Sequence, residues 1–143
     1  IAGNIATGAA AQALIDAGKT PNPSLCLTTP LGIDSYREEI DSFLSSLSRM
    51  PDAFVCASDY VACILMQLLE KRGLRVPEDV AVSGFDNNIE DLLAENLTTV
   101  QVFNEELGSR LALQILYRIK YPHTPHEVTY LESKVLYRAS TGD

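Results

Sequence analysis

Two aspartates follow predicted strands in the segment from Pro51 to Asp86. This stretch is predicted to form a strand, a loop, a helix, a turn and a second strand. Asp59 comes after the first strand and Asp86 after the second. In open α/β sheets, ligands bind outside the carboxyl ends of the strands. A carboxylate accepts up to four hydrogen bonds, so one aspartate can hold two adjacent hydroxyl groups. The spacing therefore predicts a pocket for a hydroxyl-bearing small molecule.

Each of these polar residues also has a purely structural explanation. Ser58 and Asp59 directly precede a predicted helix, where serine and aspartate are favoured N-caps. We assign Asp59 to capping and Ser58 to a minor ligand role. Asp86 has the alternative of shaping a turn, because aspartate favours loops after strands. Gly84 is best explained as small-residue clearance at the end of a strand.

Strands and helices alternate along the chain. Residues 5–17 form a predicted alanine-rich helix that ends at Gly18. The other predicted helices are 36–47, 59–72 and 104–120, with a helical turn at 89–95, and strands are predicted at 24–29, 53–57, 80–85, 98–102 and within 127–137. This alternation predicts an α/β fold in which helices cover both faces of a mostly parallel sheet.

Composition excludes several classes of protein. A chain of 143 residues favours a single domain. Its net charge of −8 disfavours direct contact with nucleic acid, because phosphate contacts need lysine and arginine. Its 3 cysteines, an odd number, favour a reduced, cytoplasmic setting. No apolar stretch is long enough to cross a bilayer, so we expect no membrane association.

Motifs for catalysis and for cofactor binding are not evident in the sequence. It contains no glycine-rich phosphate loop and no nucleophile elbow, so we expect neither an enzyme nor a bound cofactor. His123 and His126 have metal-like spacing, but they lie in a proline-rich turn with no third ligand nearby. We therefore interpret them as a solvated turn and expect no metal site.

Four sequence motifs resemble a known family. They are PDAFVCASD, GLRVPEDVAVSGFDN, LTTVQ followed by EELG, and YRAST. In this order they resemble the effector-binding domain of the lactose/galactose repressor family, which are bacterial transcription regulators with a periplasmic-binding-protein fold. The resemblance implies that residues 1–143 form the C-terminal lobe of a two-lobed domain. It further implies a sugar-like small-molecule effector, a homodimer, and DNA binding only through a headpiece that is not in this chain.

The same resemblance implies which residues face the ligand. It places the ligand-anchoring acid at Asp86, and it places Ser58 and Asp59 where the family usually has Asn-Asp. The stretch GNIATGAAAQAL has no arginine, although the family often carries one there. In the loop TTPLGID, Pro30 and Leu31 stand where many members stack an aromatic ring on the ligand. The candidate ligand-binding residues are therefore Asp86, Ser58, Asp59 and Leu31.

The segment 103–121 forms a helix that in the family packs on the other lobe. Leu107, Leu111, Ile115 and Ile119 recur at intervals of four and form a broad apolar face. Because the other lobe is missing here, we expect this chain to self-associate through the helix, by pairing helices or by exchanging them. The alternative is that the helix folds back on its own sheet.

Two other functions remain open at this point. A solute-binding protein of a sugar transporter has the same fold and a similar cleft, but the cysteines and the YRAST ending count against it. A phospho-receiver would need an acidic pair after its first strand and a lysine after a late strand, and IAGN and LTTVQ supply neither.

Overall fold

The computed structural model describes residues 4–28, 35–88 and 94–142. Apart from the strand predicted at 24–29 and the turn predicted at 89–95, most of which lies outside the described residues, its helices and strands follow one another as the sequence pattern predicts. The α/β class is confirmed. In chain order the elements are α1 (Asn4–Asp16), η1 (Pro23–Leu25), α2 (Tyr36–Ser46), β1 (Ala53–Val55), α3 (Asp59–Lys71), β2 (Ala81–Ser83), η3 (Ala94–Asn96), β3 (Thr99–Gln101), α4 (Asn104–Lys120), β4 (Lys134–Leu136) and η4 (Ala139–Thr141).

The strands form two pairs that are joined by single bridges. β1 and β2 are parallel, with Phe54 opposite Val82. β3 and β4 are antiparallel. Parallel bridges from Ser83 to Thr98 and from Asp86 to Gln101 join the two pairs. The carboxyl ends of β1, β2 and β3 therefore share one edge, and the polar loops that follow these strands meet there.

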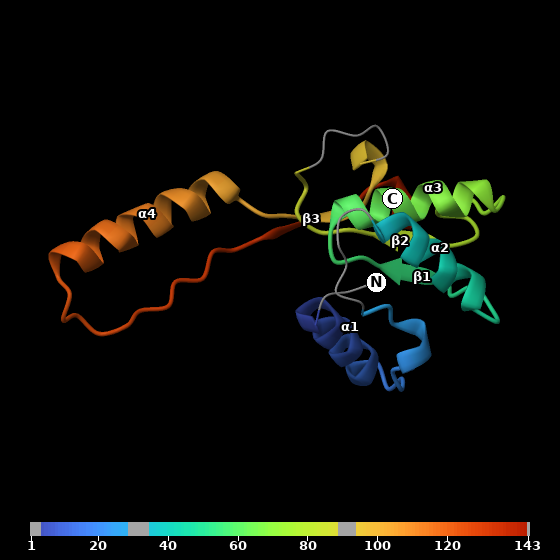
Figure 1. Ribbon diagram of the computed structural model, residues 1–143, viewed down its shortest axis with the longest axis horizontal. Coiled ribbons are helices and arrows are strands. Elements are labelled where there is room, and N and C mark those ends of the chain that lie inside the picture. The colour runs from blue at the N-terminus through green and yellow to red at the C-terminus, as the bar shows by residue number, and fades with distance from the viewer. Residues whose placement is uncertain (1–3, 29–34, 89–93, 143) are drawn as a thin grey trace.

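The core lies between the β1–β2 pair and two helices, α2 and α3, on one side of it (Figure 1). α3 begins after Ser58 and ends before Gly73, whose φ of +73° suits a residue without Cβ. Apolar residues surround most of this helix, so it packs against both the sheet and α2. The core is formed mainly by Ile40, Phe43, Leu44, Phe54, Val61, Ile64, Leu65, Leu68, Leu69, Val82 and Leu97.

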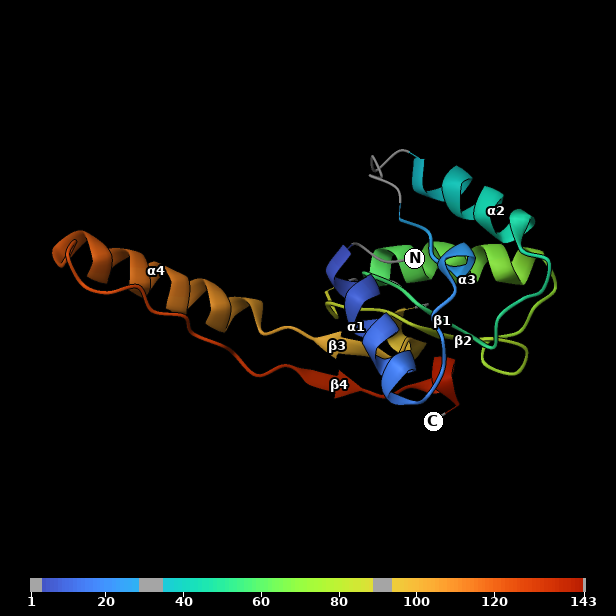
Figure 2. The same ribbon diagram turned by 90° about the horizontal axis from the view of Figure 1, so that it is seen from below.

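α1 lies on the opposite side of the strands from α2 and α3, as the two views agree (Figures 1 and 2). It ends at Gly18, which has a φ of +72°. The face on this side is less well covered, since the Val55 side chain is 51% exposed.

The strand predicted at 24–29 is wrong for the residues that the structure describes there. Pro23–Leu25 instead form the 3-10 turn η1. The side chain of Asn22 accepts a hydrogen bond from the Ser24 backbone N–H, and the proline ring favours the helical φ at the first position. Local capping therefore satisfies backbone groups that a strand would have paired with a neighbour.

α4 points away from the rest of the chain, and residues 121–133 return beside it to β4 (Figure 2). None of its residues is buried. The alternative in which this helix folds back onto its own sheet is therefore not observed. The excursion formed by α4 and residues 121–133 leaves the packed strands and helices after β3 and returns to them at β4.

Candidate functional site

Asp86 lies where β2 passes into its loop, at the shared carboxyl edge of the strands. Its φ is +108° and that of Asn87 is +51°, and both values are uncommon for residues other than glycine. The backbone N–H of Asp86 donates to the Val100 carbonyl at 3.0 Å, and its own carbonyl accepts from the Val102 N–H at 3.4 Å. The carboxylate is partly buried and makes no hydrogen bond to the described part of the chain.

The surroundings of Asp86 disfavour its charged form. Burial raises the pKa of the Asp86 carboxyl above its ordinary value, and the nearby negative charge of Asp59 raises this pKa further. Hydroxyl groups that donate to the Asp86 carboxylate would favour the ionised form and offset this cost. The site therefore suits a ligand that donates hydrogen bonds to this carboxylate.

Asp59 is buried, with only 1% of its surface exposed, and its carboxylate connects different segments of the chain. One carboxylate oxygen accepts from the Thr99 hydroxyl at 2.6 Å, and the other accepts from the Asn87 backbone N–H at 2.7 Å. The carboxylate thus joins the start of α3 to β3 and to the Asp86 loop.

The prediction that Asp59 caps α3 is wrong. Ser58 is the N-cap, with extended backbone and with its hydroxyl oxygen accepting from the Val61 N–H at 3.4 Å. Asp59 is the first helical residue. Sequence alone left two adjacent cap-forming residues, and the approach of Thr99 and Asn87 decided which one turned inward.

Gly84 provides the clearance that the sequence predicted. A Cβ at this position would fall on a carboxylate oxygen of Asp59, 2.9 Å from Cδ2 of Leu97 and 3.1 Å from the Asp59 Cα. A side chain at this position would therefore displace the carboxylate that holds the loop.

Arg138 and Asn87 are site residues that the sequence prediction missed. The Arg138 guanidinium donates to the Asn87 side-chain oxygen at 2.8 Å, to the Ala94 carbonyl at 2.9 Å and to the Leu97 carbonyl at 3.0 Å. Asn87 in turn donates through its side-chain nitrogen to Gln101 at 2.6 Å. Arg138 lies within the YRAST motif, which indicated only the family. Nothing in the local sequence of this motif predicts hydrogen-bond partners that are so distant in the chain.

A polar hollow of about 520 Å³ lies beside this loop, between the end of β3 and the first turn of α4. Its polar lining includes Asn87, Gln101, Glu105 and Glu106. Of the four candidate ligand-binding residues, the structure brings Asp86, Asp59 and Ser58 to this edge. Leu31 lies outside the described residues.

Residues 3–141 match the model of a family described as the periplasmic binding protein-like domain. This chain belongs to that family. The HTH-type transcriptional regulator GalR of Streptococcus thermophilus is 32% identical over 84% of this chain and 37% of its own length. The solved structure of a LacI-family transcriptional regulator from Sanguibacter keddieii has a TM-score of 0.80, with 28% identity over 93% of this chain and 50% of that one.

A second solved structure, the transcriptional regulator CelR–cellobiose complex, has a TM-score of 0.77 and 29% identity, over 90% of this chain and 39% of that one. These comparisons confirm the resemblance to the lactose/galactose repressor family. This chain spans 37% of the length of the GalR relative, and 50% and 39% of the two solved chains.

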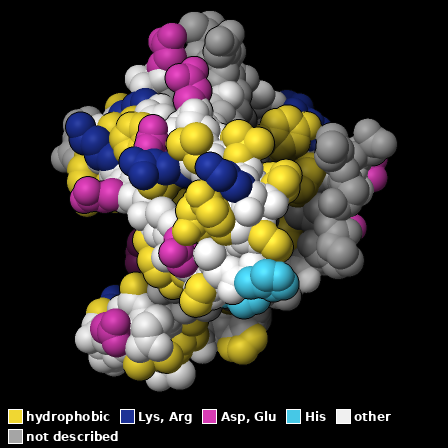
Figure 3. Space-filling model, turned by 90° about the vertical axis from the view of Figure 1, so that its left-hand side faces the viewer, with side chains coloured by type: hydrophobic (Ala, Val, Ile, Leu, Met, Phe, Trp, Pro, Cys, Tyr) yellow, Lys and Arg dark blue, Asp and Glu magenta, His cyan; other side chains and the backbone are white. Residues whose placement is uncertain are grey.

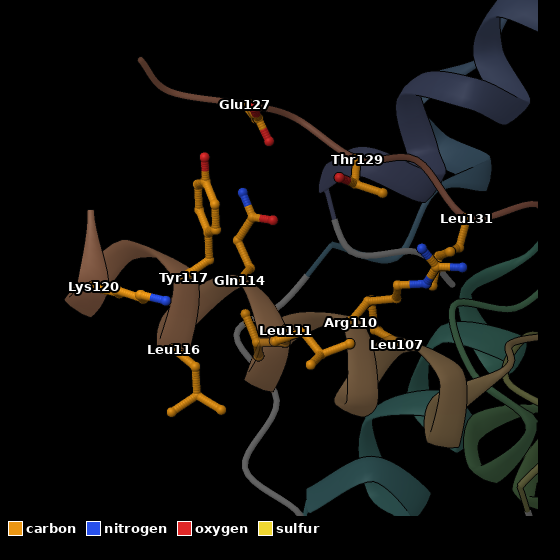
Figure 4. Close-up of a pocket in the computed structure, with 11 residues that line it drawn as sticks. Leu107, Arg110, Leu111, Gln114, Leu116, Tyr117, Lys120, Glu127, Thr129 and Leu131 are labelled. Atoms are coloured by element: carbon orange, nitrogen blue, oxygen red, sulfur yellow. The ribbon is translucent and has the colours of Figure 1, made fainter. Parts of the chain in front are cut away.

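Besides the polar hollow, an apolar groove of about 710 Å³ runs along α4. Figure 4 shows the side chains of Leu107, Leu111 and Tyr117 on the helix, with Thr129 and Leu131 across from them on the irregular segment that returns to β4. Figure 3 views the molecule from this end and shows many hydrophobic side chains at its surface. The exposed fractions of Leu111, Ile115 and Ile119 are 59%, 52% and 72%.

The described part of this periplasmic binding protein-like domain contains no helix long and apolar enough to span a membrane. The same residues contain no group of three or more histidine, cysteine, aspartate or glutamate side chains arranged to hold a metal ion. Burial raises the pKa of the Cys56 thiol to about 12, so this cysteine stays protonated near neutral pH.

Proposed function

We propose that this chain is the C-terminal lobe of the effector-binding domain of a bacterial transcription regulator. Its relatives are transcription regulators, which supports this role over that of a transporter's solute-binding protein and over an enzyme. The remainder of such a regulator would supply a first lobe and a DNA-binding headpiece, and the assembly would act in the cytoplasm as a homodimer.

The observation that carries this proposal is the Asp86 carboxylate. It stands at the carboxyl edge of parallel strands, held by a left-handed backbone, with its acceptor positions unused by the described residues. Ligands of open α/β sheets bind at this edge. A carboxylate of this kind recognises adjacent hydroxyl groups, so the effector we propose is a sugar or a related polyol. The cellobiose in one relative's structure supports the same class.

The remaining candidate residues take different parts in the proposed site. Asp59 uses both oxygens within the protein, so its part is to hold the loop behind Asp86. The Ser58 hydroxyl oxygen already accepts a cap hydrogen bond, which leaves it a minor ligand role. Leu31 keeps its proposed place as an apolar contact to the ligand.

The exposed face of α4 supports the two-lobed arrangement. Burying a large apolar side chain contributes roughly 1.5–3 kcal/mol, so a face with several exposed leucines and isoleucines is costly in water. We propose that the first lobe of the complete regulator covers this face. The effector would then lie between the lobes, beside Asp86 and the polar hollow of about 520 Å³.

Calorimetry on the complete regulator with cellobiose and a panel of common mono- and disaccharides tests the proposal. Asp86→Ala should weaken binding of whichever sugar binds the wild type by more than about tenfold, because a hydrogen bond to a charged group contributes roughly 1.5–3 kcal/mol. Asp79→Ala is the matched control, since Asp79 pairs with Arg75 in a turn at the amino end of β2. Equal affinity in Asp86→Ala and wild type would remove Asp86 from the site.

A further inference from the structure

Arg138 stands where the excursion formed by α4 and residues 121–133 re-enters the lobe, two residues beyond β4. Its backbone N–H donates to the Thr98 hydroxyl at 2.8 Å. Its guanidinium binds the Leu97 and Ala94 carbonyls, and it also binds Asn87. This one side chain, which follows β4, thus fastens both the loop after β2 and the turn before β3.

Asn87 depends on its neighbours for its conformation. A left-handed backbone at a residue other than glycine persists only where the surrounding contacts over-determine it. Three contacts do so here: the Asn87 N–H is held by Asp59 at 2.7 Å, its side-chain nitrogen by Gln101 at 2.6 Å, and its side-chain oxygen by Arg138 at 2.8 Å. Because Asn87 directly follows Asp86, these contacts also direct the Asp86 carboxylate.

We propose that Arg138 is a positioning residue of the effector site, which directs the Asp86 carboxylate through its hydrogen bond to Asn87. This inference rests on the proposed role of Asp86 as the effector anchor. Losing the guanidinium from the Asn87 side-chain oxygen would release the loop that carries Asp86.

The chemistry of arginine suits this position. A guanidinium presents five donors in a planar fork, which allows it to serve two carbonyls and one amide oxygen at once. A lysine ammonium is a compact point charge on a flexible stem, so it keeps the charge without the fork geometry. Arg138→Lys should therefore restore only part of the effect of Arg138.

Nuclear magnetic resonance on the 143-residue chain without effector tests the inference. Two signals report on the loop: the exchange rate of the Asn87 amide hydrogen and the chemical shift of the Asp86 side-chain carboxyl carbon. Arg138→Gln should speed amide exchange at Asn87 by at least about tenfold beyond any change in global stability, since it removes charge-assisted hydrogen bonds. It should also shift the Asp86 signal, and Arg138→Lys should give a smaller change in both.

Arg72→Gln is the matched control. Arg72 also binds backbone carbonyls, those of Leu68 and Asp41, but it lies at the far end of α3, roughly 20 Å along the helix from Asp59. It should lower stability without moving either signal. If both Arg138 variants leave the two signals as they are in Arg72→Gln, Arg138 only holds the fold and the inference is overturned.

If Arg138→Gln does not fold, Arg138→Lys decides by the same two signals. Since no effector is present, a failure here is separate from a failure of the Asp86→Ala affinity test.

Discussion

Gly84→Ala should destabilise the chain strongly, although it adds one methyl group. The new Cβ would meet a carboxylate oxygen of Asp59 and would lie 3.1 Å from the Asp59 Cα and 2.9 Å from Leu97 Cδ2. Overpacking a rigid site costs about 1–3 kcal/mol. Moving the carboxylate aside would instead give up a hydrogen bond to Thr99 or Asn87, at roughly 1.5–3 kcal/mol. Because the contact with the Asp59 Cα persists in either case, we expect the free energy of unfolding to fall by about 2–3 kcal/mol.

Urea unfolding followed by far-ultraviolet circular dichroism measures this loss. Gly108→Ala is the control, because Gly108 lies in α4 and, apart from its chain neighbours and the helix backbone, nothing lies within 4 Å of its added Cβ. That change should leave the lobe's stability unchanged or raise it by up to about 1 kcal/mol through helix propensity. A Gly84→Ala protein within about 0.5 kcal/mol of wild type would refute the steric reasoning, because that is the range of neutral surface substitutions.

The remaining predictions concern Asp86 and α4. The pKa of the Asp86 carboxyl is raised in the folded state, so the fold favours the protonated form of this group. The resulting stabilisation is fully present below the unfolded pKa of about 3.9 and is lost as pH rises through the folded pKa. The free energy of unfolding of Asp86→Asn, measured with urea and compared with that of wild type, should therefore be relatively higher at pH 7 than at about pH 3.5. An equal difference between the two proteins at both pH values would contradict this. In sedimentation experiments, the isolated chain should self-associate through α4, and the Leu111→Glu/Ile115→Glu variant should be monomeric. Ser109→Glu is the control and should self-associate like wild type. A wild type that stays monomeric at high concentration would exclude the pairing.

Local sequence determined a large part of this protein. The apolar pattern of α3 and the glycine after it located the helix, and strand-end polarity placed Asp86 at the edge where ligands bind. The apolar face of α4 was also visible, because it depends only on residues four apart in one helix. The order of the four motifs also indicated the family.

Tertiary structure decided which polar groups meet. The Asp59 carboxylate and the Asn87 N–H are 28 residues apart, and Arg138 and Asn87 are 51 apart. Periodicity and capping rules describe neighbours in the chain, so they assigned Asp59 to a cap and overlooked Arg138. Asp59 turns inward because Gly84 leaves room for its carboxylate and because Thr99 and Asn87 offer donors there, and those groups are adjacent only after the strands have paired.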